Sequence, residues 1–161
     1  MSIAANHCSI YNARRSFMEL ESCINYLLSV SQNTVFQYFS QQLSVHNITP
    51  AQYGVLNCLW SEEPLTPKQI GKRLHLEAST ISTILDKMQN NDLIVRNIEP
   101  NNRRNILVFT TPKALLLKPS VEKIVMDMND YILEEFTPEE REILSTLLLS
   151  IISKHSKHLK K

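Results

Sequence analysis

The stretch from Leu74 to Met88 carries the side chains best suited to binding chemistry. Its apolar residues recur at helical spacing, which predicts an amphipathic helix with one face on a core. That face consists of Ile81, Ile84, Leu85 and Met88. The opposite face carries hydroxyls and charged groups, which are Ser79, Thr80, Ser82, Thr83, Asp86 and Lys87. Such a face can hydrogen-bond to base edges and phosphates, whereas for this helix alone the simpler interpretation is a solvated surface.

Cationic residues gather in the middle of the chain. Residues 66–113 hold eight Lys or Arg against four acids, a net charge of +4, although the whole chain has a net charge of +1. The flanking segments, 1–65 and 114–161, carry net charges of −2 and −1. Arg103 and Arg104 follow Asn102 in a polar loop between two strand-like runs. A basic segment between such flanks predicts a polyanionic partner.

Patterns typical of catalysis and metal binding do not occur in the sequence. There is no Ser/His/Asp set, phosphate-binding glycine loop or carboxylate pair in context, so we do not expect an enzyme. The cysteines, Cys8, Cys23 and Cys58, form no CxxC pair, which argues against a zinc site or a disulfide framework. His155 and His158 stand three residues apart without a carboxylate or thiol partner there, so we expect no metal and no cofactor.

Length and composition favour one domain with helical extensions. The chain has 161 residues, of which 43% are hydrophobic and only 2 are glycine. No run of about 18 apolar residues appears, so we expect no membrane span. The N-terminus lacks a charged region followed by a long apolar core, so we expect no signal peptide and a cytoplasmic protein.

Four Thr-Pro pairs mark expected helix starts. Threonine can cap the free N–H groups of a helix, and proline suits the first helical position. In three of the four, a Gln or Glu stands three residues after the threonine and completes a capping box. The pairs begin at Thr49, Thr66, Thr111 and Thr137. They predict helices to about residue 60, to residue 74, to about residue 136 and toward the C-terminus, and Pro119 predicts a kink or a late start in the third.

Long apolar stripes and two short β-branched runs complete the expected order. A stripe from Ser16 to Leu43 predicts a long first helix, part of which is expected to pack against another subunit. Leu93–Ile98 and Ile106–Thr110 predict a β-hairpin with a polar loop over residues 99–105. The opening helix is expected to end near Asn90–Asp92, because Asn and Asp tolerate the left-handed conformation.

The resulting order of helix, short helix, turn, helix, strand, basic loop and strand resembles a winged helix-turn-helix regulator of the MarR family. The resemblance covers about residues 16–158 and rests on an ordered set of segments. These are Ile48–Leu56, Leu65–Leu74, Ser79–Met88 and the wing with Asn102–Arg104. It implies a homodimer whose first and last helices form the interface. The two recognition helices would then enter successive major grooves of a pseudo-palindromic operator, about 34 Å apart.

The resemblance also implies roles for individual residues. The residues expected to contact the groove are Ser79, Thr80, Ser82, Thr83 and Lys87. Those expected to contact phosphates or to belong to the wing are Gln69, Lys72, Arg73, Asn102, Arg103 and Arg104. Three features depart from the family pattern. Asn102 replaces the usual wing acid, glycine is common at Asp92 and Ala114, and Glu77 is a weak cap for the recognition helix.

A small ligand or a cysteine oxidation often releases DNA in this family, which directs attention to residues of the first helix. Organic-peroxide sensors of the family carry a reactive cysteine near Cys23. No Lys or Arg lies close in sequence to activate this thiol, and a small core residue is the alternative. Tyr26, Tyr38 and Phe39 are candidates to line a pocket for a phenolic or other aromatic effector, with core packing as the alternative.

We therefore expect a mainly α fold with a small β-hairpin (α+β). It is a winged helix-turn-helix with long N- and C-terminal dimerisation helices. The expected divisions are a loose arm, an N-terminal dimerisation helix, a DNA-binding domain and C-terminal dimerisation helices, over residues 1–15, 16–48, 49–111 and 112–161. The expected function is that of a transcriptional regulator that binds double-stranded DNA sequence-specifically as a homodimer, with a repressor favoured over an activator. The alternative is a winged-helix protein-interaction module without DNA binding, against which the wing arginines and the basic middle segment argue.

Overall fold

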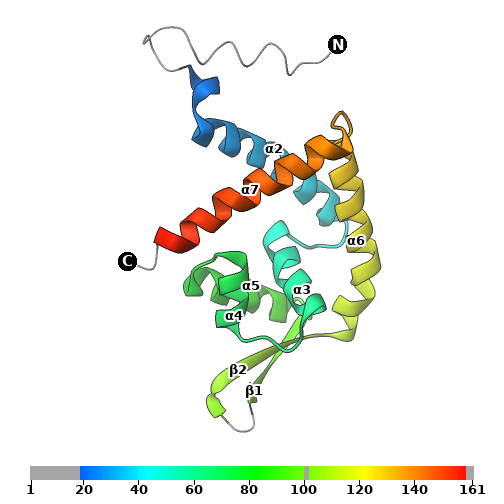
Figure 1. Ribbon diagram of the computed structural model, residues 1–161. Coiled ribbons are helices and arrows are strands. Elements are labelled where there is room, and N and C mark those ends of the chain that lie inside the picture. Colours follow the sequence, from blue (N-terminus) through cyan, green and yellow to red (C-terminus); the bar gives the residue numbers. More distant parts are fainter. Residues whose placement is uncertain (1–18, 100–101, 159–161) are drawn as a thin grey trace. The chain divides into compact units, whose positions relative to one another are not determined.

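The computed structural model describes the backbone of residues 19–99 and 102–158 (Figure 1). The chain divides into two compact units, Met1–Phe36 and Gln37–Lys161. A short 3-10 helix, η2 (Leu20–Ser22), precedes the elements of the main fold. In chain order these are α2 (Ile24–Ser44), α3 (Pro50–Ser61), α4 (Pro67–Leu74), α5 (Ala78–Asn90), β1 (Ile94–Glu99), β2 (Asn102–Thr110), α6 (Pro112–Ile132) and α7 (Pro138–His158). This order confirms the predicted α+β fold with a winged helix-turn-helix.

The Thr-Pro pairs begin helices as predicted. The Thr49 hydroxyl accepts from the Gln52 backbone N–H at 3.3 Å, and the Gln52 side chain accepts from the Thr49 N–H at 3.0 Å. Equivalent capping boxes link Thr66 to Gln69 and Thr137 to Glu140. Thr111 caps α6 through the Ala114 N–H at 3.2 Å, without a second bond because alanine has no acceptor. Each helix start is thus determined within four residues of sequence.

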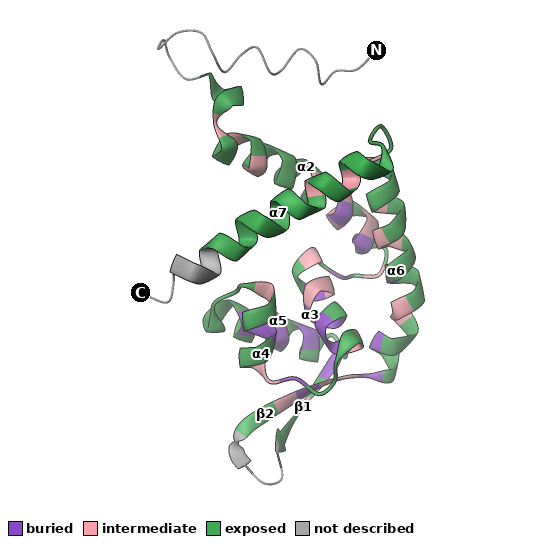
Figure 2. Cartoon of the chain, viewed as in Figure 1, coloured by how far each residue is buried: buried purple, intermediate pink, exposed green. Residues whose placement is uncertain are grey.

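The core of the second unit lies where α3, α4 and α5 meet the wing (Figure 2). Each of these helices contributes aliphatic side chains that solvent does not reach. They include Val55, Leu56 and Leu59 of α3, Ile70 of α4, and Ile81, Leu85 and Met88 of α5. The strands also contribute to this core, through the buried side chains of Ile94 in β1 and Val108 in β2. In contrast, α7 is exposed along most of its described length.

The wing is a two-stranded antiparallel sheet. Ile94 pairs with Thr110 and Ile98 pairs with Ile106, but Glu99 pairs with Asn102, so the register shifts near the tip. The predicted loop over residues 99–105 is therefore wrong, since Asn102 already belongs to β2. Asn and Arg have weak strand preference, and the pairing with β1 overrides it.

Two predicted helix boundaries are wrong. The first long helix begins at Ile24 and not near Ser16, because Cys23 adopts an extended backbone with φ −89° and ψ 109°. Apolar spacing identifies the buried face of a helix but not its first residue. The late start considered for the helix containing Pro119 is also wrong, since α6 begins at Pro112 and ends at Ile132.

The turn from α5 into β1 uses a left-handed residue. Asp92 has φ 55°, and its backbone N–H donates to the Gln89 carbonyl at 3.0 Å. Its carbonyl accepts from the Thr111 hydroxyl at 2.8 Å, which joins this turn to the start of α6. The predicted helix end near residues 90–92 is thus confirmed.

Within the described residues, no helix has the length and apolar character needed to cross a membrane.

Replacing Asp92 with Gly should stabilise the protein. Glycine adopts positive φ without steric cost, and both hydrogen bonds of Asp92 described above use backbone atoms. We expect a gain of roughly 0.5–1 kcal/mol in the free energy of unfolding, measured by urea denaturation at matched protein concentration. Asn91→Gly is the matched control, because Asn91 has φ −89° and glycine there should lower stability. A loss of stability in Asp92→Gly would contradict the expectation.

Candidate nucleic-acid interface

Helix α5 presents the predicted polar face to solvent. The side chains of Ser79, Thr80, Ser82, Thr83 and Lys87 are all exposed. Behind them, Ile81, Leu85 and Met88 are at most 1% exposed. The Thr83 hydroxyl donates to the Ser79 carbonyl at 3.0 Å, so one of the outward hydroxyls is already bonded within the helix. The helix is therefore fixed by its apolar face and offers small polar groups outward.

The N-terminus of α5 has no side-chain cap. Glu77 stands at the N-cap position, and its side chain makes no capping hydrogen bond. This confirms the expectation that Glu77 is a weak cap. The preceding turn contains His75 in the left-handed conformation, with φ 53°. The free N–H groups at this end of α5 are available to an anionic group of a partner.

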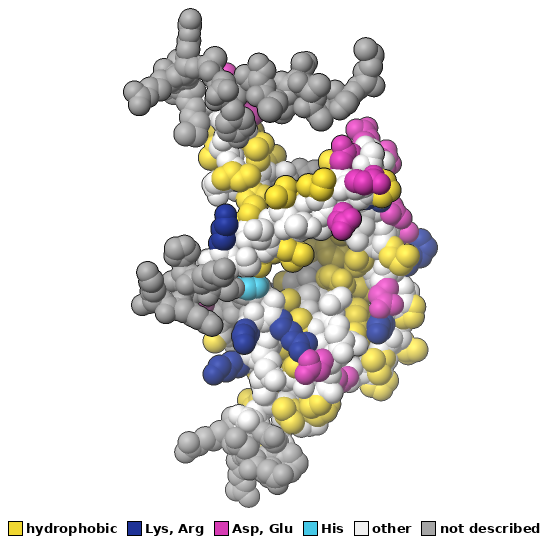
Figure 3. Space-filling model, viewed as in Figure 1, with side chains coloured by type: hydrophobic (Ala, Val, Ile, Leu, Met, Phe, Trp, Pro, Cys, Tyr) yellow, Lys and Arg dark blue, Asp and Glu magenta, His cyan; other side chains and the backbone are white. Residues whose placement is uncertain are grey.

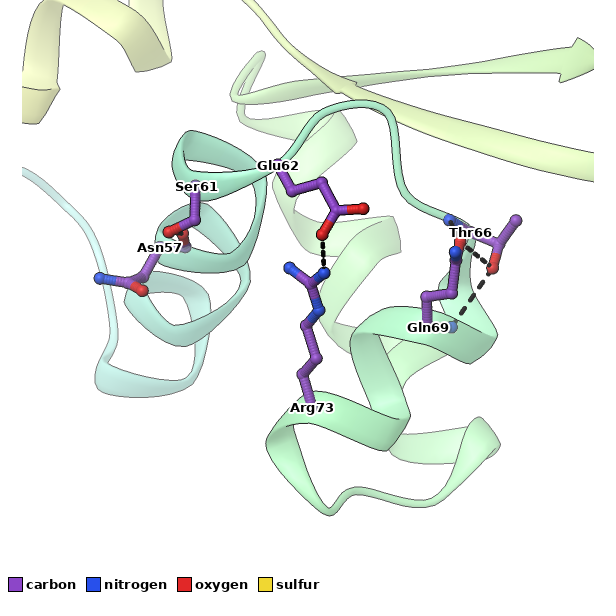
Figure 4. Close-up of polar contacts among 6 residues, drawn as sticks. All are labelled: Asn57, Ser61, Glu62, Thr66, Gln69 and Arg73. Atoms are coloured by element: carbon purple, nitrogen blue, oxygen red, sulfur yellow. Dashed lines mark hydrogen bonds and ion pairs between the residues drawn. The ribbon is translucent and has the colours of Figure 1, made fainter.

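Two of the predicted phosphate-binding residues of α4 already have partners within the chain (Figure 4). The Arg73 guanidinium forms an ion pair with the Glu62 carboxylate. The side-chain oxygen of Gln69 accepts from the Thr66 N–H at 2.7 Å and from the Thr66 hydroxyl at 2.8 Å. Lys72, the third, is exposed. The sequence pattern could not reveal the Arg73 pair, because Glu62 lies eleven residues away.

Lys68 is a candidate that sequence reasoning missed. It is exposed in the first turn of α4 and lines a shallow hollow of about 520 Å³ with Thr66, Pro67 and Gln69. Asn105 and Ile106 of β2 form the other side of the hollow. A lysine beside a helix start and the wing can attract a phosphate. Its position directly after the Thr-Pro cap was the available sequence signal.

The predicted wing residues belong to β2. Asn102, Arg103 and Arg104 lie in the irregular part of the strand pairing, but their side chains fall outside the described part of the structure. At the base of the wing, the Leu65 and Val108 backbones exchange hydrogen bonds of 2.8 and 3.4 Å. The loop before α4 thus holds β2 next to α4.

Another ion pair joins the wing to α5. Arg96 of β1 donates to the Asp86 carboxylate at 2.7 Å. Asp86 lies on the polar face of α5, so this acid is neutralised beside the candidate DNA-binding side chains. Sequence reasoning missed Arg96 because its partner is ten residues away and lies on a different element.

Charge is unevenly distributed over the visible face of the molecule (Figure 3). Lys and Arg side chains gather over α4, whereas Asp and Glu side chains gather where α6 and α7 join. The acidic group includes Glu134, Glu135, Glu139 and Glu140. A polyanion would therefore be attracted to the helix-turn-helix end of this face and repelled from the other.

The four candidate effector residues do not form one described cluster. Cys23 and Tyr26 belong to the first unit, whereas Tyr38 and Phe39 belong to the second. Tyr38 stacks on Tyr131 of α6 with ring centroids 4.6 Å apart, and Phe39 packs edge-on against Tyr53 at 5.2 Å. Cys23 is half-buried, and its carbonyl accepts from Leu27 at the start of α2. Tyr38 and Phe39 thus both take part in aromatic packing.

Burial makes Cys58 and Tyr53 harder to ionise. Burial raises the pKa of the Cys58 thiol, and the charge of Arg73 lowers it by a smaller amount. Burial also raises the pKa of Tyr53, partly offset by its hydrogen bond with Asn57. Cys58 is therefore a packed core thiol with low reactivity.

Within the described residues, no group of three or more His, Cys, Asp or Glu is placed to hold a metal.

Known proteins resemble this chain in sequence. A family model described as MarR family matches residues 48–106, which run from the start of α3 into β2. The organic hydroperoxide resistance transcriptional regulator of Bacillus subtilis (strain 168) is 34% identical over 101 residues. The match covers 63% of this chain and 69% of that protein.

Solved structures share the fold over most of the chain. The transcriptional repressor CouR bound to a 23-mer DNA duplex matches with a TM-score of 0.79 and 25% identity, covering 87% of this chain and 99% of that one. The PcaV transcriptional regulator from Streptomyces coelicolor, in complex with its natural ligand, matches with a TM-score of 0.80 and 22% identity. That match covers 86% of this chain and 98% of PcaV, and at this identity it shows the fold alone.

Replacing Lys68 with Ala should weaken binding to every DNA duplex by a similar factor. A phosphate contact carries no sequence information, and its loss should lower the slope of log K against log salt by roughly 0.9. Fluorescence anisotropy titrations at several salt concentrations measure both quantities. Lys123→Ala is the control, because Lys123 is exposed on α6 in an ion pair with Asp127. Equal slopes for Lys68→Ala and the wild type would contradict the assignment of Lys68.

Proposed function

Because this chain belongs to the MarR family of transcriptional regulators, whose members are not enzymes, we propose that it represses transcription as a homodimer on a pseudo-palindromic operator. One observation carries the proposal. The exposed polar row on α5 is held outward by Ile81, Leu85 and Met88, which are buried, and by Ile84, which is partly buried. The wing projects beside this helix from the same core (Figure 1). A helix with this support can enter a major groove while the wing reaches the neighbouring backbone.

The proposed roles follow the placement of the side chains. Ser79, Thr80, Ser82, Thr83 and Lys87 contact base edges and nearby phosphates from α5. Lys72 and the newly identified Lys68 contact phosphates from α4. Gln69 and Arg73 make such contacts only after exchanging the intramolecular partners described above. Asn102, Arg103 and Arg104 act from the wing, on the backbone or in the minor groove.

The homodimer is proposed from the exposed apolar side chains of α7. This helix leaves six large aliphatic residues between 38% and 65% exposed: Ile143, Leu147, Leu148, Leu149, Ile151 and Ile152. An apolar patch of this kind marks a protein interface more often than a solvated surface. A twofold dimer through this helix and α2 would present two copies of α5, as a pseudo-palindromic operator requires.

A protein-interaction module without DNA binding is the competing function. The exposed lysines of α4 and α5 support DNA, because an electropositive surface beside a groove-sized helix suits a polyanion better than a neutral protein. The repressor CouR, which shares this fold, is bound to a DNA duplex in its solved structure. These points favour DNA as the partner.

The test is binding to the DNA upstream of the protein's own gene. We expect a mobility shift at nanomolar protein, with two chains per duplex by native mass spectrometry. Arg104→Ala should weaken binding to all sequences and lower the salt slope by roughly 0.9. Ser82→Ala should instead weaken binding to the operator more than to an unrelated duplex of equal length. The absence of any shift at low salt would favour the interaction module.

Release of DNA is proposed to follow a chemical signal, either a small aromatic ligand or oxidation of Cys23. The relative from Bacillus subtilis is named for organic hydroperoxide resistance, and Cys23 is half-buried while Cys58 is in the core. In the oxidation, the Cys23 sulfur takes one oxygen from the hydroperoxide and becomes a sulfenic acid. The hydroperoxide is reduced to the alcohol. For the ligand, Tyr38 and Phe39 offer aromatic surfaces.

Mild organic hydroperoxide should modify Cys23 and release the operator, whereas Cys23→Ser should stay bound. Cys58→Ser is the matched control and should respond like the wild type, because a buried thiol with a raised pKa holds little thiolate at neutral pH. Mass spectrometry of the cysteine peptides and anisotropy of the DNA complex measure the two effects. Unmodified Cys23 with an intact complex would remove the oxidation route and leave the ligand, which titration with phenolic acids then tests.

A further inference from the structure

Side chains on the core-facing side of the wing change from buried to exposed on either side of Arg96. On the face of the sheet that packs on the core, successive pairs toward the tip are Ile94 with Thr110, Arg96 with Val108, and Ile98 with Ile106. Ile94 and Val108 are buried, whereas Ile98 and Ile106 are 64% and 43% exposed. Arg96 therefore marks the boundary between the packed base of the wing and its exposed part. Figure 1 shows the hairpin of β1 and β2 projecting away from the helices.

The partner of Arg96 lies at the C-terminal end of the row of exposed polar residues on α5. Residues 79, 82, 83 and 86 follow each other at i, i+3, i+4 and i+7, so Asp86 continues the row of Ser79, Ser82 and Thr83. Its carboxylate accepts from the Arg96 guanidinium at 2.7 Å. The pair thus joins the DNA-facing row of one element to the projecting part of the other.

Burial gives this pair more weight than an ordinary surface ion pair. The Arg96 side chain is 21% exposed, and its Nε atom is buried without a hydrogen-bond partner. A half-buried guanidinium that has lost its carboxylate keeps the cost of desolvation without compensation. Arg96 can avoid that cost by moving outward, and β1 would move with it.

We propose that Asp86 and Arg96 are positioning residues that set the angle of the wing relative to α5, so that both elements reach DNA together. The inference rests on the proposed DNA-binding function. Strands rise by about 3.3 Å per residue, so the tip residues begin roughly 10 Å beyond Arg96. A rotation of about 10° at Arg96 therefore displaces the start of the wing tip by roughly 2 Å, more than a phosphate hydrogen bond tolerates.

The experiment is a double-mutant cycle with Asp86→Asn, Arg96→Gln and the double variant, titrated against the operator and an unrelated duplex of equal length. Each single variant should bind the operator about tenfold more weakly, and the double variant should lose no more than either one. Binding to the unrelated duplex should weaken by a similar factor, because the wing contacts the backbone of any duplex. Hydroxyl-radical footprints should lose only the protection contributed by the wing. Asp127→Asn is the matched control, since it removes the 2.6 Å Lys123–Asp127 pair on α6 and should change none of these values.

Three results would overturn the proposal. Asp86→Asn binding both duplexes more tightly would mean that Asp86 acts only as a negative charge near phosphates. A loss in Arg96→Gln with unchanged Asp86→Asn would mean that Arg96 contacts DNA itself. Losses that multiply in the double variant would mean that the two residues act independently.

Amide hydrogen exchange of the free protein separates this inference from the proposed function. Both single variants should speed exchange in residues 97–99 and 105–107, while the core of α3 and α5 exchanges as in the wild type. Unchanged exchange would overturn the positioning role even if the variants bind DNA less well. If both variants exchange faster but the protein binds no DNA, the positioning role of the Asp86–Arg96 pair would stand. Only the DNA-binding function would then be rejected.

Discussion

Burial of one face of α5 is the constraint on which the rest of the interface depends. Ile81, Leu85 and Met88 pack against α3, α4 and the base of the wing, and each such side chain contributes about 1.5–3 kcal/mol. The uncapped start of the helix forgoes only about 1 kcal/mol. Packing therefore outweighs capping here, and it fixes the direction in which the hydroxyl row and Lys87 point.

The wing depends on the same core through very short connections. Only three residues separate α5 from β1, and Asp92 turns the chain in a left-handed conformation. Thr111 then bonds to the Asp92 carbonyl and caps α6 with the same hydroxyl. Hydrogen bonds consequently join the end of α5 and the start of β1 to the start of α6.

Ion pairs within the chain change how its charge should be counted. Arg73 pairs with Glu62 and Arg96 pairs with Asp86, so two of the cations in the basic middle segment are internally neutralised. The exposed Lys68, Lys72 and Lys87 retain their attraction for a polyanion, together with whatever the wing arginines add. The Arg73 pair is more exposed and should be worth little in stability, so it can yield to a phosphate more easily than the Arg96 pair can yield to water.

The sequence by itself determined the features that depend on neighbouring residues. The capping boxes at Thr49, Thr66 and Thr137 involve contacts across three residues, and the spacing of Ile81, Leu85 and Met88 defines a helix face wherever that helix packs. Tertiary structure decided what depends on distant partners. The Asp86–Arg96 and Glu62–Arg73 pairs, the assignment of Asn102 to a strand and the hollow beside Lys68 all require elements brought together by the core. The start of α2 at Ile24 could not be predicted from the sequence either. No proline, glycine or change in periodicity marks the extended backbone at Cys23. Contacts between residues a few positions apart follow from the order of the residues. Contacts between distant residues form only when the helices and strands pack together.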